Sequence, residues 1–427
     1  MNYKETLEYL YASAPVYQHS GAQAYKPGLG TSRALDDYLG NPHRCYRTVH
    51  VAGTNGKGSV CHTLAAILQA AGLRTGLYTS PHLTDFGERI RVNGEMIDGD
   101  YVTDFVRRSR SFFEPLHPSF FELTSAMAFD YFRHCNVDCA VIEVGLGGRL
   151  DSTNIISTAL SIITNISIDH TELLGNTLKD IAIEKAGIIK QGTPVVIGRA
   201  DDETVVNVFR RKAAEMNAPL LLAQEEKPAH IEQSIYETKD FGRIRYGLTG
   251  EVQHENLATV LCALRELGRL LPLRLDQETV NRGASDVAGL TGLRGRWEKL
   301  RDRPHTIADT GHNPGAWRYI TARIEAYCKE RGCRAYMVTG FSNDKDVDAI
   351  LRLAPREAFY IFTQAGSQRA MPAVTLLEKA RAAGLDGMAF ASAPEAVAFA
   401  MSEASEDDMV FIGGSNFIVA GILPLFG

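Results

Sequence analysis

Three glycines, a lysine and a serine are closely spaced between a short apolar strand and an amphipathic helix. The segment Gly53-Thr-Asn-Gly-Lys-Gly-Ser59 follows the apolar Val49 and Val51. Glycines adopt backbone conformations that are closed to other residues, so the N–H groups of this loop can turn inward, and the helix N-terminus adds a partial positive charge. We expect a phosphate-binding loop in which Lys57 reaches the outer phosphates and Ser59 offers a hydroxyl to Mg²⁺. The candidate nucleotide contacts are Gly53, Thr54, Asn55, Gly56, Lys57, Gly58 and Ser59.

The loop is a variant of the usual nucleotide-binding spacing. Val51 stands where that motif has its first glycine, and Gly58 is inserted between Lys57 and Ser59. The alternative is a glycine-rich turn that only caps a helix. A strand before the loop and a helix after it favour phosphate binding.

Composition limits the remaining possibilities. The 427 residues are 45% hydrophobic and 22% charged, which suits a globular chain of two domains. A net charge of -6 argues against a general nucleic-acid binder. Seven scattered cysteines predict a reducing compartment without a disulfide framework. No secretory signal is recognised, and glycines, polar residues and a proline interrupt the most apolar stretch, 410–426. We expect a cytoplasmic monomer that binds neither nucleic acid nor membranes.

Apolar runs alternate with helical periodicity along the chain, which predicts an α/β fold with parallel sheets flanked by helices. Residues 1–40 predict a helix, a Gly/Pro-rich loop at 20–30 and a short helix. Further on, strands are expected at 76–80, 88–94, 138–148, 159–168 and 194–198, helices at 120–135, 181–189 and 255–270, and a hairpin at 233–248. The boundary falls in the Gly- and Arg-rich loop 289–296. Beyond it we expect strands at 305–309, 335–339, 358–363, 388–391 and 409–413, with helices at 314–331, 347–353, 373–383 and 394–404. The prediction is a first domain, 1–294, and a smaller doubly wound domain, 295–427.

Polar residues follow several of the predicted strands, where parallel α/β sheets gather their ligands. Ser80, Glu143 and His170 lie at such positions and could bind Mg²⁺ together with phosphates. Read singly, His170 could be a structural residue and Glu143 could be bonded to backbone. Glu184 and Lys185 form an unusual charge pair in the apolar segment 181–189, where a surface lysine is the favoured interpretation.

The motifs together resemble folylpolyglutamate synthase / dihydrofolate synthase, a branch of the Mur ligase superfamily. They run in one order over nearly the whole chain: Gly53 to Ser59, Thr79-Ser-Pro-His-Leu83, Glu88-Arg-Ile-Arg-Val-Asn-Gly94, Glu143-Val-Gly-Leu-Gly-Gly-Arg149, Asp151-Ser-Thr-Asn154, Asp169-His170 with Leu174-Gly175, Glu184-Lys-Ala-Gly187 and His312-Asn-Pro314. The resemblance implies a P-loop ATPase domain followed by a Rossmann-like domain.

Site residues carried over by position are implied by this resemblance alone. Ser80 and Glu143 would hold one Mg²⁺, and His170 a second, with a carboxylate from a carbamylated Lys185. For ATP the pattern points to Asn256, Arg296 and Asp309. Phe121 would stack on the pterin and Asp151 would bind its polar edge, although Phe121 also reads as a core aromatic. His312 and Ser415 are the candidates for glutamate, and the glutamate site would lie near the domain interface.

The chain also departs from the family pattern. It has Asp309-Thr-Gly-His-Asn-Pro314 where the family commonly has Asp-Gly-Ala-His-Asn-Pro, and Trp297 where Phe is more usual. The segment Asn343-Asp-Lys-Asp346 fits the family, and read without it predicts a helix N-cap with a solvated Lys345.

The function implied is ATP-dependent amide formation between dihydropteroate or a folate and L-glutamate through an acyl phosphate. Bifunctionality is preferred because Phe121 and Asp151 match the pteroate pattern. Two alternatives remain, a cell-wall Mur ligase acting on a nucleotide-sugar peptide and a non-catalytic nucleotide-binding module. The order of the motifs at 79–82 and 88–91 and the lack of a further domain before the phosphate loop count against the first alternative.

Overall fold

The computed structural model describes residues 1–14, 28–232 and 234–426, which form two compact units. The first contains Met1–Ser167 and Thr171–Leu293, and the second contains Ile168–His170 and Arg294–Gly427. The division at 293/294 lies one residue before the boundary expected from the sequence. The assignment of Ile168–His170 to the second unit was not expected. Most of the loop predicted at 20–30 lies outside the described residues.

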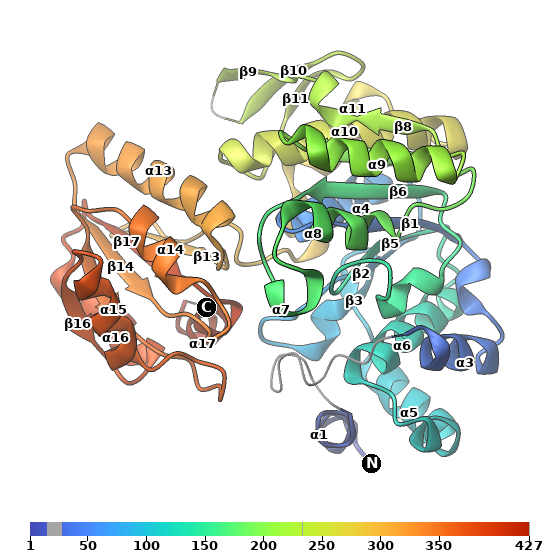
Figure 1. Cartoon of the computed structure of the whole chain (residues 1–427), viewed down its shortest axis with the longest axis horizontal. Coiled ribbons are helices and arrows are strands. Elements are labelled where there is room, and N and C mark those ends of the chain that lie inside the picture. Colours follow the sequence, from blue (N-terminus) through green and yellow to red (C-terminus); the bar gives the residue numbers. More distant parts are fainter. Residues whose placement is uncertain (15–27, 233, 427) are drawn as a thin grey trace. The chain divides into compact units, whose positions relative to one another are not determined.

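An eight-stranded sheet organises the first unit, in the order β4-β3-β2-β5-β1-β6-β7-β8 (Figure 1). Its strands are β1 (Arg47–Ala52), β2 (Thr75–Tyr78), β3 (Ile90–Val92), β4 (Glu95–Met96), β5 (Cys139–Glu143), β6 (Leu160–Asn165), β7 (Val195–Arg199) and β8 (Leu220–Leu222). Six strands are parallel, but β3 and β4 pair antiparallel at one edge. The predicted parallel sheet is confirmed, and its antiparallel edge is an addition that short connections make possible.

Helices and a small sheet complete the first unit. The helices are α1 (Tyr3–Ser13), α3 (Gly30–Tyr38), α4 (Lys57–Ala70), α5 (Gly99–Phe113), α6 (Phe120–His134), α7 (Thr171–Leu174), α8 (Leu178–Ala186), α9 (Glu203–Glu215), α10 (Glu251–Leu270), α11 (Gln277–Ser285) and α12 (Val287–Thr291). The predicted hairpin is present as β10 (Ile235–Thr238) and β11 (Gly242–Arg245), joined by β9 (Ala229–Glu232). Because α12 is helical, the predicted boundary loop 289–296 begins later than expected.

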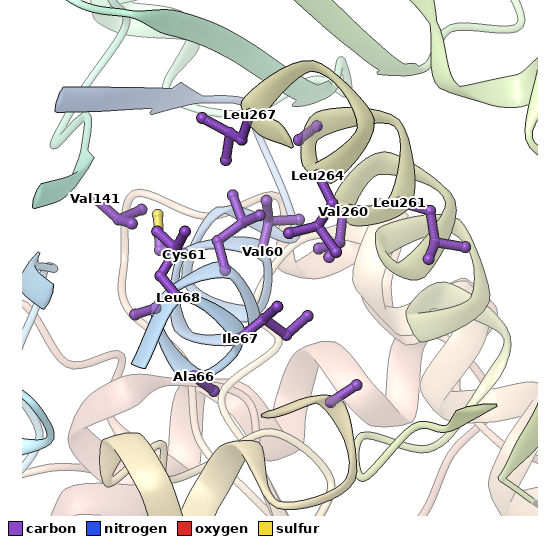
Figure 2. Packing of buried hydrophobic residues seen from close by; sticks show 14 of the residues in the cluster. Val60, Cys61, Ala66, Ile67, Leu68, Val141, Val260, Leu261, Leu264 and Leu267 are labelled. Atoms are coloured by element: carbon purple, nitrogen blue, oxygen red, sulfur yellow. The ribbon is translucent and has the colours of Figure 1, made fainter. Parts of the chain in front are cut away.

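The phosphate loop is fixed by the burial of the helix that follows it. Residues 58–68 of α4 are all buried, so this helix is covered on every side and lies inside the unit. Figure 2 shows Val60 of α4 facing Val260 and Leu264 of α10, all within one core cluster. Burial of each such side chain contributes about 1.5–3 kcal/mol, which anchors the loop at the helix start.

The second unit has a six-stranded sheet in the order β12-β13-β17-β14-β15-β16. Its strands are β12 (Glu298–Arg301), β13 (His305–Asp309), β14 (Ala335–Thr339), β15 (Phe359–Phe362), β16 (Gly387–Ala389) and β17 (Met409–Gly413), and its helices are α13 (Pro314–Arg331), α14 (Val347–Leu353), α15 (Ala373–Ala382), α16 (Ala393–Glu403) and α17 (Asn416–Ile422). All pairings are parallel except β12 with β13. The predicted doubly wound fold is confirmed, with β12 and α17 as additions.

The seven cysteines are free thiols. Among the described residues, no helix combines the length and the apolar character needed to cross a membrane.

Candidate active site

The loop after β1 is shaped by the end of the neighbouring strand β6. Thr54 N donates to Asn165 O at 3.0 Å, and Asn55 N donates to Asn165 Oδ1 at 2.8 Å. Thr164 Oγ1 donates to Asn55 O at 2.6 Å. Gly53 has a φ of +150°, and a Cβ there would lie 1.8 Å from Thr164 Oγ1. Only glycine therefore fits at position 53, and the loop backbone is locked against β6.

Two lysines converge on one carbonyl of this loop. Lys57 Nζ donates to Gly53 O at 3.1 Å and to Thr54 O at 3.3 Å. Lys185 Nζ donates to the same Gly53 O at 2.8 Å. Lys185 is only 4% exposed, so the interpretation as a surface lysine is wrong. Glu184, the residue before Lys185 in the chain, forms an ion pair with Arg149 at 2.8 Å.

Close backbone packing brings Lys185 to the loop. Arg149 N donates to Glu184 O at 2.8 Å, which joins the loop after β5 to the end of α8. A Cβ at Gly148 would lie 3.0 Å from Lys185 Cα, and a Cβ at Gly187 would lie 2.4 Å from Arg149 Cα. Gly148 and Gly187 are therefore needed because the backbone of the loop after β5 lies in contact with the backbone at the end of α8.

Ser80 and Glu143 are neighbours, as their positions at the ends of β2 and β5 suggest. Ser80 N donates to Glu143 Oε2 at 3.0 Å, and Glu143 is 4% exposed. A hydroxyl and a carboxylate supply the hard oxygen ligands that Mg²⁺ prefers. Across the described residues, no three His, Cys, Asp or Glu side chains could hold a metal by themselves. A metal here would therefore need hydroxyl, phosphate or modified-lysine oxygens as well.

A short chain of side chains links α10 to the start of α4. Asn256 Nδ2 donates to Gln253 Oε1 at 2.9 Å, and Gln253 Nε2 donates to Ser59 Oγ at 3.3 Å. Gly56 has a φ of +82°, and a Cβ there would lie 2.3 Å from Asn256 Oδ1. The structure therefore places the predicted nucleotide contact Asn256 against the phosphate loop.

In the second unit, Arg296 precedes β12 and Asp309 ends β13, so the two residues lie at the same end of an antiparallel strand pair. Asp309 accepts hydrogen bonds from Trp297 N at 2.8 Å and from Gly311 N at 2.7 Å. Burial raises the pKa of the Asp309 carboxyl above its usual value, while Arg296 acts in the opposite direction. Arg296 also donates to the hydroxyl of Thr310, which donates in turn to Gly295 O at 3.1 Å. Thr310, which stands where the family commonly has glycine, therefore positions the Arg296 side chain.

Asp169 is the centre of a buried polar cluster in the same unit. Lys345 Nζ donates to Asp169 Oδ1 at 2.7 Å, and Asn313 Nδ2 donates to Asp169 Oδ2 at 3.2 Å. The Nε2 atoms of His312 and His170 lie 3.7 Å and 3.9 Å from Oδ2. Burial opposes ionisation, but the nearby His312, His170 and Lys345 hold the pKa of Asp169 well below its usual range. The alternative interpretation of Lys345 as a solvated lysine is wrong, since its side chain is 9% exposed.

Comparisons with known proteins agree with this architecture. The chain matches the Mur ligase middle domain over residues 51–264 and the Mur ligase glutamate ligase domain over residues 295–416. It is 32% identical to the dihydrofolate synthase/folylpolyglutamate synthase of Bacillus subtilis, over 93% of this chain and 94% of that protein.

The chain belongs to the folylpolyglutamate synthase and dihydrofolate synthase family of Mur ligases.

Two solved structures carry the same fold. Escherichia coli FolC in complex with DHPP and ADP has a TM-score of 0.86 and 29% identity, over 100% of this chain and 97% of that one. The bifunctional folylpolyglutamate synthase/dihydrofolate synthase of Yersinia pestis, complexed with AMPPNP and a Mn ion, has a TM-score of 0.84 and 28% identity, over 100% and 98% of the two chains.

Phe121 and Asp151, which the family pattern links to the pterin, both contact the loop after β5. The Asp151 carboxylate is occupied by hydrogen bonds from backbone N–H groups of the chain itself. The ring of Phe121 lies 5.7 Å from that of Tyr78, and its Cζ would be 2.4 Å from a Cβ at Gly145. Asp151 is 4% exposed, and it accepts hydrogen bonds from Leu146 N at 2.8 Å and from Thr153 N at 3.0 Å. Burial raises the pKa of Asp151, against the effect of these hydrogen bonds. Asp151 therefore shapes the loop that borders Phe121.

The two glutamate candidates are held by the second unit. His312 Nδ1 donates to Thr310 O at 3.0 Å. Ser415 Oγ caps α17 by accepting from Ile418 N at 3.2 Å, and Ser415 is 5% exposed. Their roles toward glutamate stay predictions.

Three residues that shape the site were missed from the sequence: Thr164, Asn165 and Gln253. The first two lie at the carboxyl end of a predicted strand, and that position could have identified them. Gln253 precedes the predicted helix start at 255, because α10 begins earlier, at Glu251.

Proposed function

We propose that this protein is an ATP-dependent ligase that joins L-glutamate to dihydropteroate, to a folate, or to both. One observation carries the proposal. The phosphate loop is intact in a chain of this family, with Gly53 and Gly56 in conformations that turn the backbone against β6 and α10. The full-length similarity to a dihydrofolate synthase/folylpolyglutamate synthase supports the choice of substrates.

The reaction would proceed in two steps. A carboxylate is a poor electrophile, because an oxide ion would have to leave. Transfer of the γ-phosphoryl group of ATP to the carboxylate gives an acyl phosphate and ADP. The glutamate amine then attacks the acyl carbon, forms the amide bond, loses its proton and displaces phosphate. Lys57 and the loop N–H groups stabilise the charge that spreads over the transferring oxygens.

The Ser80 hydroxyl and the Glu143 carboxylate supply oxygen ligands that fit magnesium. Ser80 and Glu143, joined by a 3.0 Å hydrogen bond, would hold one ion, and His170 with a carbamylated Lys185 would hold the second. Such ions neutralise phosphate charge and orient the oxygens that react. The relative from Yersinia pestis, whose structure has AMPPNP and a Mn ion, supports binding of a nucleotide and a divalent cation.

Carbamylation of Lys185 requires a neutral amine, and the burial of Lys185 supports that state. Burial penalises the charged ammonium relative to the neutral amine.

The remaining assignments follow the family pattern. Asn256, Arg296 and Asp309 would contact the nucleotide, Phe121 would stack on the pterin, and Asp151 would support the pterin site. His312 and Ser415 would bind glutamate. We also propose that the protein acts on both acceptors.

The test measures ADP release by the purified protein with ATP, Mg²⁺ and glutamate, and with either dihydropteroate or a reduced folate. ADP should form only when an acceptor and glutamate are both present. Release with one acceptor alone would remove the dual assignment, and no release with either would overturn the ligase proposal. Lys57→Met should abolish turnover. Lys379→Met, which breaks an exposed pair with Asp348, should leave it unchanged.

A further inference from the structure

A buried ion pair holds the segment that carries His170. Ile168–His170 joins β6 to α7 of the first unit, yet these three residues belong to the second unit. Their main charged partner is Lys345, whose Nζ lies 2.7 Å from Asp169 Oδ1, and both side chains are 9% exposed. The reaction proposed above gives this pair no chemical step.

We propose that Lys345 is a positioning residue for His170. By fixing the Asp169 carboxylate, it sets the backbone that presents the His170 imidazole to a metal ion. The proposal rests on the proposed function, because His170 is a metal ligand only within it.

The backbone at His170 needs such support. Its φ is +51°, in the left-handed region that residues other than glycine seldom adopt. Asp169 Oδ1, the oxygen that binds Lys345, also accepts a hydrogen bond from His170 N at 2.9 Å. The unusual conformation is therefore stabilised by an oxygen that Lys345 holds in place.

Asp169 is also held from its other oxygen. Asn313 Nδ2 donates to Oδ2 at 3.2 Å, while Asn313 Oδ1 caps α13 by accepting from Ala316 N at 2.9 Å. Lys345 is fixed in turn by backbone bonds, from its own N to Ser342 O at 3.2 Å and from Val347 N to its own O at 2.8 Å. The start of α13 and the turn before α14 thus both position the carboxylate.

Two simpler roles for Lys345 predict different results. A purely stabilising ion pair would change the folding free energy without acting through His170. A cation that binds substrate directly would also act independently of His170. Lys345 already faces two carboxylates, Asp169 at 2.7 Å and Asp344 at 3.9 Å, which favours the positioning role. Partners that orient a metal-binding histidine typically change metal affinity or activity by about 10- to 100-fold when removed.

The experiment is a Mn²⁺ titration followed by electron paramagnetic resonance, with AMPPNP present and no acceptor or glutamate. Four variants are compared with the wild type: Lys345→Met, His170→Ala, the double variant, and Lys379→Met as a matched control in an exposed pair of the same unit. Lys345→Met should weaken Mn²⁺ binding by about 10- to 100-fold. The double variant should bind Mn²⁺ no more weakly than His170→Ala alone, and Lys379→Met should match the wild type.

Additive losses in the double variant, or unchanged Mn²⁺ affinity in Lys345→Met, would overturn the proposal. Binding of ADP without metal, measured by calorimetry, should stay within about twofold in Lys345→Met, because the hydrogen bonds of Lys345 described above do not involve the phosphate loop. If Lys345→Met does not fold, Lys345→Gln, which keeps a donor but no charge, takes its place. Failure of the proposed function would instead show as no ADP release by the wild type, a measurement that needs acceptor and glutamate.

Discussion

Replacement of Gly53 by alanine should disable the phosphate loop for a reason that can be read from its geometry. The new Cβ would lie 1.8 Å from Thr164 Oγ1, so the loop or Thr164 must move by more than an ångström. The φ of +150° adds strain of about 1–3 kcal/mol for a residue with a side chain. A displacement of about 1 Å in groups that position a substrate can cost a hundredfold in rate, about 2.7 kcal/mol. We expect kcat/KM for ATP to fall by at least about 100-fold.

A control variant separates the steric clash from the strain of a positive φ. Gly72, beyond the other end of α4, has a φ of +90°, and a Cβ there would meet none of the described residues within 4 Å. Gly72→Ala should lower the unfolding free energy by about 1 kcal/mol and leave ADP affinity unchanged. Calorimetry with ADP and urea unfolding would be run on both variants.

A second variant tests the named contact itself. Thr164→Ala removes the hydroxyl that the new Cβ would strike, at the cost of its 2.6 Å hydrogen bond to Asn55 O. In the Gly53→Ala background it should restore part of the ADP affinity, although alone it should reduce affinity slightly. The reasoning would be refuted if Gly53→Ala bound ADP as tightly as Gly72→Ala does.

Three further predictions concern other groups of the first unit. Lys185→Met should reduce turnover by about 100-fold or more without changing ADP affinity. The control Lys190→Met, which loses only a 2.8 Å hydrogen bond to Asn154 O, should retain turnover. After incubation with labelled bicarbonate, ¹³C NMR should show a carbamate signal in the wild type and none in Lys185→Met. Glu143→Gln should weaken Mn²⁺ binding with AMPPNP by about tenfold or more, and an unchanged Mn²⁺ titration would remove Glu143 from the ligand set. Burial lowers the pKa of His50 to about 3 in the folded chain. As the pH falls below about 6.5, His50 therefore binds a proton in the unfolded chain but stays neutral in the folded one, which lowers the unfolding free energy. The wild type should therefore lose about 2 kcal/mol more unfolding free energy than His50→Gln between pH 7 and pH 5 in urea titrations, and parallel pH profiles would contradict this.

Local patterns predicted those parts of the site that depend on neighbouring residues in the chain. The phosphate loop needed only the order strand, glycines and helix, and the pairing of Ser80 with Glu143 followed from the rule for strand ends. The environment of Lys185 could not be predicted in this way. Its burial depends on Gly148 and Arg149, which pack on α8 although they lie 37 and 36 residues earlier in the chain. The partner of Lys345 is likewise distant in sequence, because Asp169 precedes it by 176 residues.

The antiparallel edge of the first sheet escaped prediction for a related reason. β3 is only three residues long, and its segment began with Glu88 and Arg89, which form a 3-10 turn instead of a strand. Glu88 accepts hydrogen bonds from Leu83 N at 2.7 Å and from Asp85 N at 3.0 Å, so its carboxylate folds the chain after β2 into a compact loop. A charged residue that caps its own turn gives no apolar periodicity from which the turn could be recognised.

The glycines of the motifs indicate why this loop variant is compatible with catalysis. At Gly53 the backbone presses against β6, and at Gly148 and Gly187 it presses between the loop after β5 and α8. Each contact excludes a methyl group, and together they bring Lys185 Nζ to 2.8 Å from the Gly53 carbonyl oxygen. A larger residue at any of the three positions would separate the phosphate loop from Lys185 even if every charged side chain were kept. The site is therefore specified as much by where side chains are missing as by the lysines and carboxylates that would act in it.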